Sequence, residues 1–200
     1  MNRKIKIILI CAAALILNLL SVFVFRIVLH LPLFMDTIFT VAVTFWCGLV
    51  PGLAVSVVFN LLYPFVIHFL LGNELVLSPM LYAFCGAGII LTTWAIGHNK
   101  ENFKISVSIT ALYLALISIL SSLCTTFIGS IFDTLRWQDS DFSLFLRPFA
   151  EAFADQRFSL WVSCILAQIP ISITDRTITT FAGYGVYKIC AHFLGDDFTK

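Results

Sequence analysis

Long apolar runs, separated by short polar segments, dominate this chain of 200 residues. A helix that crosses a bilayer needs about 20 mostly apolar residues, and most of the runs approach or exceed that length. The pattern therefore predicts an all-α fold: a polytopic, six-transmembrane-helix bundle that forms a single membrane domain over residues 1–200. The predicted spans are residues 5–29, 36–50, 53–71, 78–97, 105–131 and 174–193.

The segment before the last predicted span does not fit one simple crossing. A polar stretch over residues 132–157 passes into an apolar stretch that is interrupted by Pro170. Beyond the proline, Ser172 and Asp175 have the spacing of a helix-starting capping box. The pattern therefore predicts an interfacial or re-entrant helix over residues 142–169, a break at Pro170, and a separate final span.

Composition supports a membrane location. Hydrophobic residues make up 60% of the chain and charged residues only 12%, whereas soluble domains have about 45–50% apolar and about 25% charged residues. The lipid bilayer is therefore an expected partner. No basic run is long enough to indicate nucleic acid binding. The first apolar run is too long for a signal peptide, so we expect it to be retained as a span.

The distribution of charge predicts the orientation. Lysine and arginine are enriched in cytoplasmic loops, and six spans would put seven basic residues on one face: Arg3, Lys4, Lys6, Lys100, Lys104, Lys188 and Lys200. The other face would carry a mixed set: Glu74, Asp133, Asp139, Asp141, Glu151, Asp155, Arg136, Arg147 and Arg157. We predict a multi-pass protein of the cell membrane with cytoplasmic N- and C-termini.

Ionisable residues near hydrocarbon are costly and usually functional, which draws attention to Asp36 at the start of the second predicted span. This carboxylate could cap its helix or contact a solute, and Arg26 is its expected ion-pair partner. Thr40, one turn further on, is a second candidate. It is also compatible with a hydrogen bond inside its own helix.

Other polar residues lie inside apolar stretches and have two possible roles. Asn60 could join helices by hydrogen bonding or could line a pocket, and Gln168 has the same alternatives. We include Tyr63 and Tyr82 as further candidates for contact with a solute. Asp175 and Arg176, at the predicted start of the last span, could form a fold-locking ion pair or could bind substrate.

No catalytic motif is found in the sequence, so we expect no enzymatic activity and no catalytic residues. The histidines and cysteines lack metal-ligand spacing, and we predict neither a metal site nor a cofactor. The sequence has no ATP-binding motif. If the chain takes part in active uptake, it therefore needs partners that supply the energy.

Two segments resemble a known family. The segment PLFMDTIFTVAVTFWCGLVPGLAVSVVFNLL resembles the P-L-F-L-D-T-I-G-T … G-x-x-x-G … N segment of the S components of energy-coupling factor (ECF) transporters. The segment ITDRTITTFAGYGVYK resembles the D-K/R-x-I segment that opens their last helix. Phe39 replaces the usual glycine, and Arg176 replaces a common lysine. A cluster at residues 12–14 replaces the A-x-x-x-A face that usually docks the coupling subunit.

The resemblance implies a six-helix subunit that binds a vitamin, a vitamin precursor or a metal ion from outside the cell. Among these we predict a vitamin-like small molecule as substrate. The resemblance also implies a membrane coupling subunit and two cytoplasmic ATPase subunits as partners. Related segments occur in membrane-embedded sensory parts of signalling proteins, so a sensory or interaction module is the alternative function.

Overall fold

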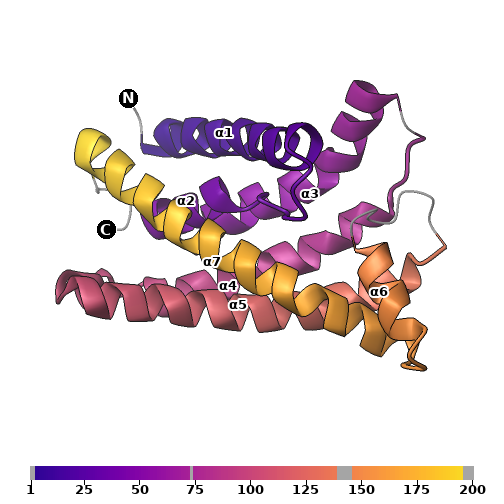
Figure 1. Ribbon diagram of the computed structural model, residues 1–200. Helices are drawn as coiled ribbons and strands as arrows, with labels where there is room; N and C mark the ends of the chain where they lie inside the picture. The colour runs from indigo at the N-terminus through magenta and orange to yellow at the C-terminus, as the bar shows by residue number, and fades with distance from the viewer. Residues whose placement is uncertain (1–2, 73, 139–145, 196–200) are drawn as a thin grey trace.

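The fold was examined in a computed structural model that describes residues 3–72, 74–138 and 146–195 (Figure 1). Asp139, Asp141 and Lys200 lie outside the described residues. The helices are α1 (Arg3–Val22), continued by a π-helix (Phe23–Val28), then α2 (Ile38–Cys47), α3 (Leu49–Leu71), α4 (Ala83–Gly97), α5 (Val107–Leu135), α6 (Arg147–Ala154) and α7 (Leu160–Leu194). Short 3₁₀-helices, Ser78–Tyr82 and Lys100–Lys104, precede α4 and α5. The described residues contain no strand, which confirms the all-α prediction.

Within the described residues, four helical segments are long and apolar enough to cross a bilayer: Arg3–Val28, Leu49–Leu70, Ser78–Gly97 and Val107–Leu135. Helix α2 is apolar but has only 10 residues, about 15 Å at the rise of an α-helix. Helix α7 is long but more polar. The structure therefore supports a membrane protein, and four of the six predicted spans meet the length and hydropathy expected of a crossing.

The bundle exposes many large apolar side chains and buries both apolar and small polar ones, as expected for helices that pack against each other in lipid. Helix α5 exposes a row of large apolar side chains that includes Leu116, Leu123 and Phe127. Its opposite side buries Ser118, Ser121, Ser122, Thr125, Thr126, Ser130 and Asp133. Several of these hydroxyls donate to the carbonyl four residues earlier, such as Ser121 Oγ to Ile117 O at 2.6 Å, so small polar groups are buried without an unmet hydrogen bond.

Helix α2 forms the centre of the bundle. Nine of its ten residues are buried, and it packs against α1, α3, α4 and α7. Its contact with α7 is close at Gly183, because a β-carbon there would lie 2.7 Å from the Ile38 carbonyl oxygen. Gly48, at φ +95°, ends α2 and lets α3 begin at once. The short helix is thus shielded from lipid on all sides by its neighbours.

The predicted break at Pro170 is wrong. Helix α7 runs unbroken for 35 residues through Pro170, so residues 160–169 belong to it, and only α6 remains as a separate short helix in the expected interfacial region. A proline removes one backbone hydrogen bond, but such losses are tolerated in membrane bundles where neighbouring groups satisfy the backbone. The expected capping box is also absent, since Ser172 and Asp175 lie buried in the middle of α7.

The start of α1 and the end of α7 lie at the same end of the bundle, together with the α4–α5 connection (Figure 1). One contact joins the α4–α5 connection to α7, and a second joins the end of α2 to the end of α7. Lys100 Nζ lies 5.0 Å from the centre of the Tyr187 ring, and Trp46 Nε1 donates to the Gly195 carbonyl at 3.0 Å. The helix segments that carry the described basic residues of the predicted cytoplasmic set therefore meet at one end of the molecule.

Candidate functional site

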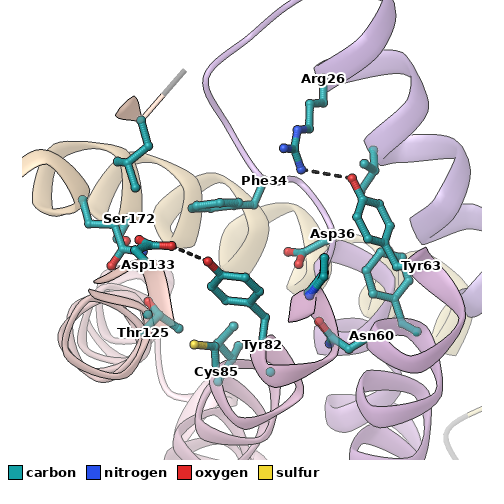
Figure 2. Close-up of a pocket in the computed structure, with 18 of the residues that line it drawn as sticks. Arg26, Phe34, Asp36, Asn60, Tyr63, Tyr82, Cys85, Thr125, Asp133 and Ser172 are labelled. Carbon is teal, nitrogen blue, oxygen red and sulfur yellow. Dashed lines mark hydrogen bonds between the residues drawn. The ribbon is translucent and has the colours of Figure 1, made fainter. Parts of the chain in front are cut away.

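A cavity of about 360 Å³ opens at the other end of the bundle (Figure 2). It lies between the π-helix that ends α1, the second half of α3, the start of α4, the end of α5 and the first half of α7. Its volume falls in the usual range for small-molecule sites, which is about 300–1,000 Å³. The walls combine aromatic rings with arginine and aspartate side chains, so the cavity has both apolar and charged surfaces.

Most of the candidate residues from the sequence meet in this cavity. Seven of the nine line it: Arg26, Asp36, Asn60, Tyr63, Tyr82, Gln168 and Arg176. The remaining two, Thr40 and Asp175, lie behind the wall. These seven residues come from four different helical segments and one connection, and the fold brings them around a single space.

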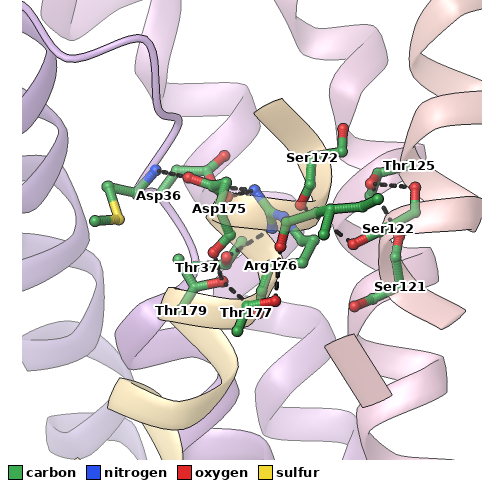
Figure 3. A network of polar contacts seen from close by, with 12 residues as sticks. Asp36, Thr37, Ser121, Ser122, Thr125, Ser172, Asp175, Arg176, Thr177 and Thr179 are labelled. Carbon is green, nitrogen blue, oxygen red and sulfur yellow. Dashed lines mark hydrogen bonds and ion pairs between the residues drawn. The ribbon is translucent and has the colours of Figure 1, made fainter. Parts of the chain in front are cut away.

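Arg176 lies between two carboxylates on one wall (Figure 3). Its guanidinium pairs closely with Asp175, donates to Thr37 Oγ1 at 2.7 Å and reaches Asp36 Oδ1 at 3.3 Å. The side chain of Asp36 is 25% exposed, while that of Asp175 is fully buried. The arginine that pairs with Asp36 is therefore Arg176, and the expected pairing with Arg26 is wrong.

Asp175 and Thr40 hold the bundle together. Asp175 Oδ1 accepts the backbone N–H of Met35 at 2.8 Å, which ties the α1–α2 connection to α7. Thr40 Oγ1 accepts from Asn18 Nδ2 at 2.7 Å, and Asn18 Oδ1 accepts the N–H of Phe39 at 3.1 Å. These bonds join α1 to the first turn of α2, so the position of Asp36 is fixed from both sides.

Arg26 lies in the π-helix that continues α1 and donates to Tyr63 Oη at 3.0 Å. Tyr63 in turn stacks on Phe59, with ring centres 5.8 Å apart. π-Helical turns are rare and frequently occur at functional sites, because the extra residue per turn changes the direction of nearby side chains. Here that turn carries the arginine that lines this side of the cavity.

The opposite wall carries a second polar cluster around Asp133, which is 2% exposed. Tyr82 Oη donates to Asp133 Oδ1, and Gln168 Nε2 donates to Oδ2 at 2.8 Å. Arg136 donates to Ser78 Oγ at 2.7 Å and lies over the Tyr82 ring, 5.4 Å from its centre. The charge pattern of the sequence predicts Asp133 and Arg136 only as outer-face charges, whereas both line the cavity.

Two amide side chains in the cavity wall differ in their bonding. Asn60 Nδ2 donates to Ser56 O within its own helix at 2.9 Å, so its hydrogen bond does not join two helices. Gln168 is oriented by Asp133, because a carboxylate requires the NH₂ end of the amide. Its Oε1 is consequently left buried without a partner. Arg176 Nε is a second buried atom of the wall without a partner.

This arrangement is suited to binding a small molecule. The cavity offers two carboxylates, three arginines, two amides and several aromatic rings around one space, and these groups can select both the orientation and the charge of a solute. Among the described residues, no group of three or more histidine, cysteine, aspartate or glutamate side chains is placed to hold a metal ion.

The chain was compared with protein-family models, curated proteins and solved structures, and none of them matches it.

Proposed function

We propose that this protein is the substrate-binding S component of an ECF-type ABC transporter. In this role it captures a vitamin-like small solute, a vitamin or its precursor, at the outer face of the cell membrane. A membrane coupling subunit and two cytoplasmic ATPase subunits are its proposed partners, and they supply the energy for uptake. The protein itself performs no chemical reaction and binds no nucleic acid.

The observation that carries this proposal is the cavity that opens at one end of the bundle. Its volume of about 360 Å³ suits a solute the size of a small vitamin, and its polar groups converge from five helical segments. A membrane protein gains nothing in stability from empty space, and buried charges are costly unless they are paired. A bound solute would fill the space and would contact the partly exposed Asp36.

The two segments that resemble S components also touch each other. Asp36 and Thr37, in the first segment, bond to Arg176 in the second, across 140 and 139 positions of sequence. Residues of both segments line the cavity. The two segments lie far apart in sequence, so their contact at one site supports a common role in binding.

We further propose that six segments cross the membrane: α1, α2 with the connection before it, α3, α4, α5 and α7. Helix α2 is too short to cross the hydrocarbon core of about 30 Å alone, but it is surrounded by protein and needs no contact with lipid. The basic end of the bundle then faces the cytoplasm, and the cavity opens outward.

The direct test is to identify the solute that the protein retains. We would purify the full chain in mild detergent, release bound small molecules by denaturation and identify them by mass spectrometry. The matched variants are Arg26→Gln, which changes a cavity residue, and Glu101→Gln, which removes an exposed carboxylate at the other end of the bundle. We expect the wild type and Glu101→Gln to retain one solute in similar amounts, and Arg26→Gln to retain much less.

The proposal is refuted if no solute is retained and no vitamin or precursor binds in a broad screen. Partner identity separates the two candidate functions. Co-purification with a membrane subunit and ATPases supports the transporter, whereas co-purification with a cytoplasmic signalling protein and no ATPase supports the sensory module.

A further inference from the structure

The cavity wall at Asp36 has one more negative charge than its paired arginine can balance. Arg176 faces both Asp175 and Asp36, so three charged groups sum to −1. The closer ion pair is the one with Asp175, and the bond to Asp36 is long, at 3.3 Å. Asp36 is thus the surplus carboxylate, and it is the more exposed of the two acids.

The second oxygen of Asp36 is available to a ligand. In the described part of the chain the Asp36 carboxylate is bonded only through Oδ1, and no donor reaches Oδ2. Figure 2 shows the carboxylate in the cavity, in the space between Phe34, Tyr63 and Tyr82. A cation placed there would meet the carboxylate, which attracts positive charge, and aromatic rings, which attract it at their faces.

A second acceptor without a partner lies in the same cavity. Gln168 is 3% exposed, and Asp133 holds its NH₂ group, so Oε1 remains as an unused acceptor. The amide lies beside Gly129, where a β-carbon would come within 3.0 Å of Oε1. Both unused acceptors require hydrogen-bond donors, which an N–H-bearing group supplies.

The other charged groups of the cavity do not donate to the unused acceptors of Asp36 and Gln168. On the far wall the charge of Arg136 interacts with that of Asp133, and Arg26 donates to Tyr63. The buried Nε of Arg176 can bond an uncharged acceptor of the ligand, but the two acids beside this arginine already compensate its charge. Among the described lining residues, Arg26 and His30 are therefore the basic groups that compete with Asp36 for the charge of the ligand.

We infer that the cavity recognises an organic cation, an aromatic or heteroaromatic solute whose ammonium or amidinium N–H group binds Asp36. This inference rests on the proposed solute-binding function and narrows it to one charge class. Asp36 is the specificity-determining residue, while Asp175 keeps Arg176 and the α1–α2 connection in position. An aromatic anion of the same size is expected to bind poorly, because it would face the surplus carboxylate.

The test uses three probes with one ring and different charges: benzamidine, benzamide and benzoate. Binding to the purified full chain would be measured by titration calorimetry. We expect benzamidine to bind about tenfold or more tightly than benzoate, since one charge-assisted hydrogen bond accounts for about that ratio. Asp36→Asn should remove this preference and leave benzamide binding little changed. Glu101→Gln, an equivalent loss of one carboxylate far from the cavity, should leave the preference intact.

Asp36→Glu keeps the charge and serves as the second variant if Asp36→Asn does not fold, as judged by size-exclusion chromatography. It should retain the preference for benzamidine. Tighter binding of benzoate would overturn the inference in favour of Arg26 as the dominant charge. An unchanged preference in Asp36→Asn, or no binding of any probe, would also overturn it. A retained solute identified by mass spectrometry would in those cases still support solute binding, so the two failures are distinguishable.

Discussion

Arg176 is held by two aspartates that have different surroundings, and this difference separates a structural residue from a candidate binding residue. Asp175 is fully buried, pairs with Arg176 and accepts the N–H of Met35 at 2.8 Å. Asp36 is 25% exposed, faces the cavity and bonds to Arg176 at 3.3 Å. Removing the charge of Asp175 leaves the buried Arg176 with only the more distant Asp36 as its ion-pair partner. Removing the charge of Asp36 leaves the closer pair of Arg176 and Asp175 intact.

We therefore expect Asp175→Asn to lower the free energy of unfolding by about 3–5 kcal/mol, the range for breaking a buried ion pair by removing one partner. Asp36→Asn should cost less than about 1 kcal/mol, since partly exposed pairs contribute little. Denaturant unfolding of the two purified variants in the same detergent checks both values. Equal losses would contradict the assignment of different roles to the two acids.

At the residue scale, the sequence predicts seven of the residues that line the cavity, because polar groups are conspicuous in apolar runs. Asp36, Asn60 and Gln168 were predicted on that basis, and all three line the cavity. The sequence does not predict Asp133 and Arg136 as cavity residues, because the apolar pattern ends the fifth predicted span at residue 131. In the structure, α5 continues to Leu135. A charged residue just beyond an apolar run looks like a solvated loop residue unless the helix is extended past it.

Helix α7 shows how a proline can mislead a prediction at the scale of an element. The buried residues of α7 recur at intervals of three or four from Ser163 to Tyr187 without interruption at Pro170. That periodicity in small and polar residues was the available signal for one continuous helix. Hydropathy alone does not reveal this periodicity, because it does not distinguish the buried polar side of a membrane helix from a polar segment.

A continuous α7 predicts that Pro170 can be replaced. Pro170 is exposed on the helix, and a proline inside a helix costs about 3 kcal/mol relative to alanine. We expect Pro170→Ala to keep the fold and to raise the free energy of unfolding by about 1–3 kcal/mol. Thr177→Ala, another exposed position of α7, is the matched control and should change stability little. A destabilised Pro170→Ala variant would indicate that the proline enforces a bend that the bundle requires.

The contact between α2 and α7 depends on the absence of a side chain at Gly183. A β-carbon at this position would lie 2.7 Å from the Ile38 carbonyl oxygen and 2.8 Å from Val41 Cγ1. These atoms belong to the buried central helix and have little freedom to move. Gly185, two residues further on, would place a β-carbon with nothing within 4 Å.

These two glycines give a matched pair of variants. Gly183→Ala should lower the free energy of unfolding by about 1–3 kcal/mol, the usual cost of overpacking. Gly185→Ala should be neutral or slightly stabilising, because alanine has the higher helix propensity. Thermal unfolding of both variants, with size-exclusion profiles to confirm the folded state, measures the difference. A neutral Gly183→Ala variant would mean that α2 and α7 can separate at no cost.

For the whole molecule, the two ends of the bundle have different characters. One end gathers the start of α1, the α4–α5 connection and the end of α7, and it carries lysines and arginines (Figure 1). The other end holds the cavity, whose lining includes both aspartates and arginines. Such an asymmetry is expected when one end meets the cytoplasm and the other binds a solute from outside. The hydrophobic pattern predicts how many segments are long enough to cross, but only this charge distribution predicts their direction.

The orientation can be tested with two single cysteines at opposite ends of the bundle. Glu74 follows α3 at the cavity end, and Glu101 lies in the α4–α5 connection at the basic end; both side chains are exposed. In a background with the six native cysteines replaced, we expect a membrane-impermeant maleimide to label Glu74→Cys in intact cells. Glu101→Cys should be labelled only after the membrane is permeabilised. Labelling of both positions in intact cells would place the two ends in one compartment and refute the crossing pattern. Labelling of Glu101→Cys alone would turn the cavity toward the cytoplasm and remove the basis for uptake from outside.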